Sequence, residues 1–203
     1  GEGGIHKHDY AQRLTACLAY LMSRQADSVG LFTMDDAVRT VIPHRSRTSH
    51  LSLLLAALAK EQIGRETELG SVLSSLVPRL GRRGLVVLIS DLFGDVAELM
   101  RAIGRMRHHG HEVLVFQIWD RDELEFPFKS WTKFINLENG DDQHLVDPAA
   151  LRKSYLTNLA TYREDLLNGF RRHRIEHVEL VTDEPLVHSL SHYLSARLRL
   201  KRM

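Results

Sequence analysis

Two side chains in this sequence have the chemistry and the position to bind a hard cation. Asp91 follows the apolar run of GLVVLIS, and Thr67 stands just before the helical pattern of ELGSVL. In an open parallel sheet, ligands bind outside the carboxyl ends of the strands, where a residue such as Asp91 is expected. A carboxylate and a hydroxyl in loops are hard oxygen ligands of the kind that Mg²⁺ takes, together with several waters. Asp91 and Thr67 are therefore candidate metal ligands, although two ligands alone do not define a site.

Both residues also have a structural interpretation. Asp91 can cap the helix that follows it, but Asp95 lies closer to that helix and can fill the same role. This leaves Asp91 without a purely local task and favours a ligand or metal role. Thr67 precedes an apolar helical stripe, where threonine is a good N-cap, so both interpretations stay open for it.

The elements that must position these residues alternate between helices and strands. Leu85–Ser90 is apolar up to its last residue, so both faces of this strand must be covered, as in a parallel sheet with helices on each side. Periodicity and strand propensity predict the remaining elements. The predicted helices cover 9–25, 51–58, 69–80 with a break near Pro78, 96–106, 148–170 and a last one from Pro185, and the other strands cover 28–33, 38–43, 112–119 and 177–182.

We therefore expect the α/β class, with a mainly parallel, Rossmann-type central sheet and helices on both faces. Val38–Pro43 is expected to be the one antiparallel strand, beside its hairpin mate Ser28–Thr33. No linker or repeat divides the 203 residues, so residues 1–203 are expected to form a single domain. Within it, Trp131–Val146 predicts an inserted hairpin, because two short strands flank a tight turn at Asn139-Gly140. Asp147 is the predicted N-cap of the long helix that follows.

Composition argues against several classes of protein. Lys and Arg number 27 against 26 acidic residues, and the net charge of +1 gives no reason to expect nucleic acid or an anionic membrane as a partner. No apolar run approaches the roughly 20 residues of a membrane span, and the first residues lack the apolar core of a signal peptide, so the expected location is the cytoplasm. Cys17 is the one cysteine, which precludes an internal disulfide. We expect it to be a small buried side chain of the first helix.

Other clusters favour structural explanations. The histidines of RHHGHE, residues 107–112, surround a glycine at a helix end, where cations and a glycine C-cap are both favourable. Asp183 and Glu184 are interpreted as helix caps, and RLRLKRM at residues 197–203 as a solvated helix turn or a docking tail. The sequence has no GxSxG elbow, phosphate loop, GxGxxG or HExxH motif, and so offers no activated nucleophile.

Longer motifs match a known family in order along nearly the whole chain. The matching stretches are KHDYA, DSVGLFTMDDAVRTVIP, TELGSVLSSL, RRGLVVLISDLFGD, HHGHEVLVFQIWDRDELEFPF and VTDEPL. With these motifs the chain resembles the bacterial domain-of-unknown-function family fifty-eight, whose fold is similar to the von Willebrand factor type A domain.

This resemblance implies a metal-ion-dependent adhesion site. Type A domains hold a divalent cation between a DxSxS loop after the first strand, a threonine of a later loop and an aspartate after the fourth strand. Thr67 matches that threonine and Asp91 that aspartate, so Mg²⁺ or Mn²⁺ is the implied cofactor. Leu92 stands where a glycine commonly follows the aspartate. The DxSxS loop is not in this sequence, so we expect a domain without its first strand, a partial site, and a strand ending in DxSxS encoded upstream of Gly1.

The resemblance also implies a non-enzymatic protein-interaction module. Proteins of the family are thought to act with MoxR-type AAA+ ATPases in the assembly or maturation of other bacterial proteins, and a cation at Thr67 and Asp91 would accept a carboxylate from the partner. A metal-dependent hydrolase of phosphoesters is the alternative, because a divalent ion can activate water, but the sequence offers no convincing base for it. A metal-free scaffold is the third hypothesis.

These assignments predict how the chain binds metal. We expect little Mg²⁺ affinity for the 203 residues alone, because each loop of such a site supplies only part of the coordination. A version restored with the DxSxS loop should bind Mg²⁺ or Mn²⁺ through that loop, Thr67 and Asp91. Asp91→Ala should abolish this binding and change the free energy of unfolding by under roughly 0.5 kcal/mol, as is usual for surface positions. Calorimetric titration, with circular dichroism as the folding control, tests this, and equal affinity in the restored protein and its Asp91→Ala variant would contradict it.

Overall fold

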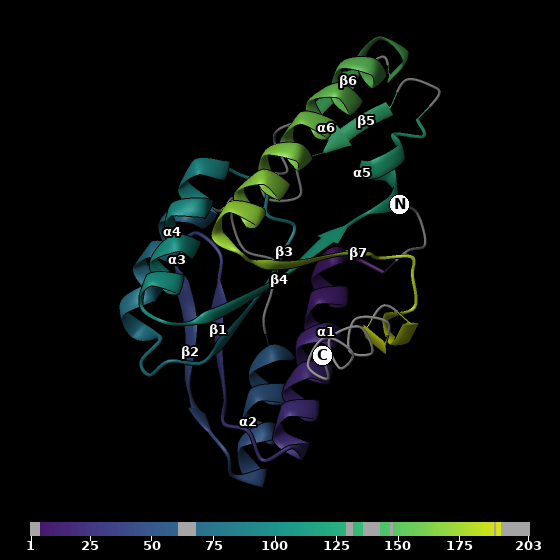
Figure 1. Ribbon diagram of the computed structural model, residues 1–203. Helices are drawn as coiled ribbons and strands as arrows, with labels where there is room; N and C mark the ends of the chain where they lie inside the picture. The colour runs from purple at the N-terminus through teal and green to yellow at the C-terminus, as the bar shows by residue number, and fades with distance from the viewer. Residues whose placement is uncertain are drawn as a thin grey trace.

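The computed structural model of this protein has a central sheet of three parallel strands. It describes residues 5–60, 68–128, 132–135, 143–146, 148–188 and 190–191. In chain order the elements are α1 (Lys7–Arg24), β1 (Val29–Met34), β2 (Val38–Arg45), α2 (Thr48–Leu58), α3 (Leu69–Leu76), the 3₁₀ turn η1 (Val77–Arg79), β3 (Leu85–Ser90), α4 (Val96–His108), β4 (Glu112–Trp119), α5 (Arg121–Glu125), β5 (Thr132–Ile135), β6 (Gln143–Val146), α6 (Pro148–His173) and β7 (Glu176–Val181). The parallel strands lie in the order β3-β4-β7 (Figure 1).

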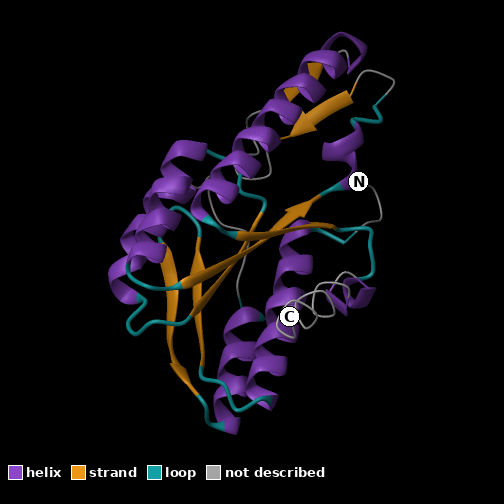
Figure 2. Ribbon diagram, in the orientation of Figure 1, coloured by secondary structure: helices purple, strands orange, loops and turns teal. Residues whose placement is uncertain are grey.

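The middle strand, β4, is buried from Val113 to Trp119, and both of its edges are hydrogen-bonded to a parallel neighbour. On one face, Leu114, Phe116 and Ile118 belong to an apolar core shared with α1. On the other face, Val113 and Val115 belong to a core shared with α3, α4 and α6. Helices therefore lie on both sides of the sheet (Figure 2), and the predicted α/β class is confirmed.

The N-terminal hairpin forms a ladder of its own. β1 and β2 pair antiparallel, and their inward residues Leu31 and Ile42 pack with α2 and with Ala19 of α1. Within the described residues, β1 and β2 form one sheet and β3, β4 and β7 form another. No ladder of hydrogen bonds joins this hairpin to the parallel strands there. Val38–Pro43, inside β2, is also not the sole antiparallel strand, because β5 and β6 pair antiparallel as well. These two strands lie where Trp131–Val146 was expected to form a hairpin, whereas its turn and Asp147 fall outside the described residues.

Cys17 is exposed, which corrects the expectation that it is buried. The buried stripe of α1 runs through Tyr10, Leu14 and Leu18 at intervals of four residues. Cys17 precedes Leu18 by one residue and is therefore turned away from the stripe by about 100°.

The other helices follow their sequence signals closely. α3 ends at Leu76 and continues as the 3₁₀ turn η1, which contains Pro78, so the predicted break is confirmed. A proline there cannot supply the next backbone donor of an α-helix. None of the helices in the part of the chain that the structure describes is long and apolar enough to cross a membrane.

The contact between α3 and α4 depends on a glycine. A Cβ atom added to Gly70 would lie 2.6 Å from the Cβ atom and 2.8 Å from the carbonyl carbon of Glu98 on α4. The neighbouring atoms belong to a helix backbone and cannot turn aside, so we expect Gly70→Ala to separate the two helices and to cost about 1–3 kcal/mol, the usual range for overpacking. Thermal unfolding followed by circular dichroism measures this as a lower melting temperature.

Gly84→Ala is the matched control, because the nearest atom to its added Cβ, the carbonyl oxygen of Arg82, is 4.0 Å away. It should melt within a degree or two of the wild type. A Gly70→Ala variant as stable as the control would show that the two helices are not held at this distance.

Candidate functional site

The carboxyl ends of the three parallel strands meet at one edge of the sheet. Asp91 follows β3, Asp120 follows β4, and Thr182 and Asp183 follow β7. The N-terminal end of α1 lies at the same edge (Figure 1), so Lys7 reaches the residues that follow the strands. This carboxyl edge combines charged residues from four separate segments of the chain.

Lys7 joins two carboxylates at this edge. Its Nζ atom is 2.8 Å from Oδ2 of Asp91 and 2.6 Å from Oε1 of Glu123. The three side chains are 29%, 35% and 25% exposed, so their ion pairs are partly shielded from water. Burial by itself lowers the pKa of Lys7, but the charges of Asp91 and Glu123 outweigh it and raise that pKa above its ordinary value. Lys7 is therefore charged at neutral pH.

Glu123 is positioned by the short helix α5. Asp120 is the N-cap of this helix, and the Glu123 carboxylate accepts a hydrogen bond from the Asp120 backbone N–H through Oε2, at 3.0 Å. This capping box leaves Oε1 of Glu123 for Lys7. The hydroxyl of Tyr155 on α6 donates to the Glu123 carbonyl at 2.9 Å, which attaches α5 to the long helix.

The loop after β3 turns through an unusual backbone conformation. Leu92 has φ +66°, in the left-handed region, while its side chain is buried. Its backbone N–H donates to Oγ of Ser90, and its carbonyl accepts from the hydroxyl of Tyr162. An L-residue in this region costs roughly 1–2 kcal/mol, and burial of a leucine contributes roughly 1.5–3 kcal/mol. Burial of the side chain thus offsets the cost of the backbone conformation of Leu92.

Phe93 places an aromatic ring on the surface beside the ion pairs. Its side chain is 42% exposed, and its ring packs against Trp119 at 5.7 Å and Tyr162 at 6.0 Å between centroids. The ammonium of Lys7 lies 5.2 Å from the centre of the same ring, in a cation–π arrangement. Burial and the nearby charge of Asp91 raise the pKa of Tyr162 to about 12, so its hydroxyl stays protonated and can donate.

A polar pair of the parallel strands, the buried Gln117 and the half-buried His177, supports this loop. The amide of Gln117 on β4 donates from Nε2 to the Asp91 carbonyl at 3.1 Å, and its Oε1 lies 3.0 Å from Nε2 of His177 on β7. Because Oε1 can only accept, His177 must carry its proton on Nε2. Burial lowers the pKa of His177, an effect that the charge of Arg163 adds to and that of Glu179 opposes.

The structure brings only part of the predicted site together. Asp91 lies at the carboxyl edge, as expected, and Asp95 is the N-cap of α4, accepting from the Glu98 N–H at 2.7 Å. Thr67 falls outside the described residues. Asp183 forms a bidentate ion pair with Arg121 of α5, with distances of 2.9 and 3.0 Å. The interpretation of Asp183 as a helix cap did not include this tertiary contact.

The described residues do not fit a divalent metal ion on their own. Nowhere among them do three His, Cys, Asp or Glu side chains converge as metal ligands. Oδ2 of Asp91 is already in contact with an ammonium group, and Oδ1 lies 3.4 Å from the Phe93 N–H. A type A metal site would need oxygen ligands beyond those that the structure describes.

Sequence reasoning missed Lys7, Glu123, Gln117 and Phe93. Two of them carry a recognisable signal. A lysine in the first turn of a helix is disfavoured by the helix dipole, so its presence there favours a compensating carboxylate nearby. Gln117 is the one polar residue inside the apolar stretch VLVFQIW, which indicates a buried group that must be hydrogen-bonded.

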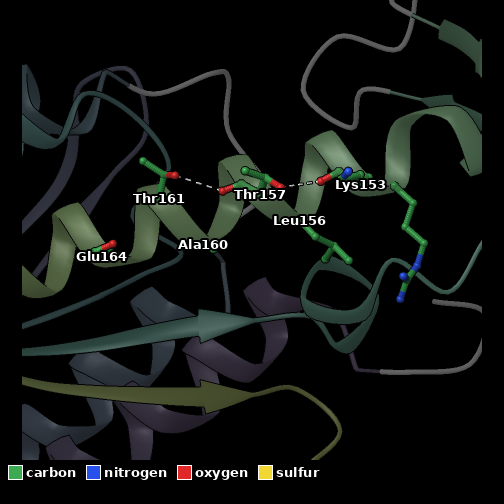
Figure 3. Close-up of a pocket in the computed structure, with 7 residues that line it drawn as sticks. Lys153, Leu156, Thr157, Ala160, Thr161 and Glu164 are labelled. Carbon is green, nitrogen blue, oxygen red and sulfur yellow. Dashed lines mark hydrogen bonds between the residues drawn. The ribbon is translucent and has the colours of Figure 1, made fainter.

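A second surface feature, a depression along α6, lies on the helix itself (Figure 3). The hydroxyls of Thr157 and Thr161 point along it, but they donate to the carbonyls of Lys153 and Thr157, at 2.9 and 3.1 Å. Their hydrogen bonds are thus satisfied within the helix, and no group of polar side chains converges there. The carboxyl edge remains the candidate functional site.

Comparison with known proteins gives the family. Residues 1–165 match the family described as a protein of unknown function, DUF58. The chain belongs to this family. Uncharacterized proteins of Mycobacterium bovis and Mycobacterium tuberculosis are 24% identical across 98% of this DUF58 chain, which spans only 63% of their length. An uncharacterized protein of Mycobacterium avium is 25% identical over 79% of the chain and 95% of its own length.

Two solved structures resemble the DUF58 chain. One is the conserved hypothetical protein BatB of Bacteroides thetaiotaomicron, with a TM-score of 0.54, 13% identity, and coverage of 95% of this chain and 88% of that one. The other is described as an aerotolerance-related membrane protein of Bacteroides fragilis, with a TM-score of 0.50, 17% identity, and coverage of 94% and 89%. At such identities the likeness shows the fold alone.

The contact of the half-buried His177 with Gln117 predicts a pH dependence of stability. The pKa of His177 is lowered in the folded protein, while in the unfolded chain it titrates near pH 6.5. Its contribution is therefore fully present above about pH 6.5 and is lost as the pH falls through the folded-state pKa. We expect His177→Gln to flatten the decline of the free energy of unfolding between pH 7.5 and pH 5 in urea titrations.

The exposed His44 on β2 provides the control. His44→Gln should leave the pH profile of the wild type unchanged. Identical profiles for His177→Gln and wild type would refute a lowered pKa of His177 in the folded protein.

Proposed function

We propose that this protein is a non-enzymatic interaction module whose partner contacts the carboxyl edge of the sheet around Asp91 and Phe93. The observation that carries the proposal is the half-exposed ring of Phe93 beside the bridged charges of Lys7, Asp91 and Glu123. Aromatic side chains surrounded by polar groups are typical anchors of protein interfaces. Trp119 and Tyr162 hold the ring in place, so little side-chain freedom is lost when a partner covers it.

The chemistry of this edge supports binding rather than hydrolysis. A general base must be free to accept a proton from a substrate or a water. Asp91 is engaged by the ammonium of Lys7, and Glu123 is shared between Lys7 and the cap of α5. The proposal therefore assigns no catalytic step to these carboxylates. In this proposal, Mg²⁺ or Mn²⁺ binds only if oxygen ligands outside the described residues, such as Thr67, take part.

The proposed partner is a MoxR-type AAA+ ATPase, with which the module would act in the assembly or maturation of other proteins. This assignment rests on the family resemblance, because the mycobacterial relatives are themselves uncharacterized. An AAA+ ATPase requires ATP, so the proposal places the contact in the cytoplasm.

The proposal predicts that Phe93 is a binding hot spot. Phe93→Ala should weaken the binding of the MoxR-type ATPase from the same organism at least tenfold, or about 1.4 kcal/mol, because truncation of an interface aromatic commonly costs this much or more. Biolayer interferometry with both purified proteins gives the dissociation constants.

Tyr20→Ala is the matched control. Tyr20 is also an exposed aromatic, at 51%, but it lies 13 residues beyond Lys7 on α1, roughly 20 Å along the helix. It should bind the ATPase like the wild type. If both variants bind equally well, or if the wild type does not bind at all, this edge is not the ATPase interface.

A further inference from the structure

The ammonium of Lys7 is surrounded by groups that attract a cation. It lies between two carboxylates that come from different parts of the chain, 84 and 116 residues away in sequence. The Phe93 ring is on a third side, 5.2 Å from Nζ. A lysine ammonium has three donors, and two of them are directed at Asp91 and Glu123.

The placement of Lys7 on its helix makes this arrangement specific. Lys7 is the first residue of α1, where the positive end of the helix dipole disfavours a cation. The contact with Asp91 and Glu123 compensates for this position. Without Lys7, two partly buried carboxylates and the helix N-terminus would remain, and both of these ion pairs would be lost.

A divalent ion and Lys7 cannot share these oxygens. A metal ion bound to Oδ2 of Asp91 would lie within about 5 Å of Nζ, because each distance to that oxygen is short. Two positive charges at such a separation repel each other strongly when they are shielded from water. The second oxygen of Glu123 is also engaged, by the N–H of Asp120.

From this geometry we infer that the Lys7 ammonium is the resident cation of the Asp91–Glu123 carboxylate pair, in place of the divalent metal that the fold family implies. Metal ions are excluded from Asp91 as long as the ion pair is intact. Ligands from a further loop would have to displace Lys7 before a metal could bind. The inference concerns the same edge of the sheet as the proposed function, and it rests on that proposal in this respect alone.

The test is a Mn²⁺ titration of four proteins: wild type, Lys7→Met, Lys7→Arg and the double variant Lys7→Met/Asp91→Asn. Free Mn²⁺ is measured by electron paramagnetic resonance, and folding by circular dichroism. Lys7→Met removes the charge and keeps the length of the side chain, whereas Lys7→Arg keeps the charge. Lys7→Gln replaces Lys7→Met if the methionine variant does not fold.

We expect a saturable Mn²⁺ site in Lys7→Met that is at least tenfold tighter than any in wild type or Lys7→Arg. The double variant should lose this site, because Asp91 supplies the carboxylate. Equal Mn²⁺ affinity in wild type and Lys7→Met, with or without measurable binding, would overturn the inference. The titration needs no partner protein, so its failure is distinguishable from a failure of Phe93→Ala to weaken ATPase binding.

Discussion

The burial of β4 on both faces and along both edges is the constraint on which the rest of the structure depends. Its apolar side chains require a helical layer on each face, and its backbone requires β3 and β7 as parallel partners. Parallel pairing aligns the carboxyl ends of the three strands. Asp91 and Asp183, which are far apart in sequence, therefore reach the same edge without any direct attraction between them.

Gln117, on the buried strand β4, positions the loop after β3. A buried amide must be hydrogen-bonded, and here Nε2 donates to the Asp91 carbonyl while Oε1 accepts from the His177 ring. The hydrogen bonds cross all three parallel strands and end at the backbone of the residue that contacts Lys7. These hydrogen bonds of Gln117 thus help to fix the backbone that carries the Asp91 side chain.

The fold was more predictable than the site, and particular residues show why. Leu85–Ser90 and Glu112–Trp119 were predicted with the bounds that the structure shows, because largely apolar runs flanked by polar residues and glycines are typical of parallel strands. The five-residue helix α5 was missed, since it is shorter than two turns and leaves no periodicity. Asp91 was identified by its place after a strand. Its contact with Lys7 was not, because 84 residues separate the two and only the tertiary fold brings them together.

α1 links the carboxyl edge mechanically to the N-terminal hairpin. Its 18 residues form a rod about 27 Å long at 1.5 Å per residue. Lys7 at one end is held by Asp91 and Glu123, and Ala19 near the other end packs with β1, β2 and α2. A helix is stiff along its axis, so a shift of its first turn is transmitted to its last. The hairpin has no strand ladder to the parallel sheet within the described residues, so side-chain packing, including that on α1, is what connects it to the carboxyl edge.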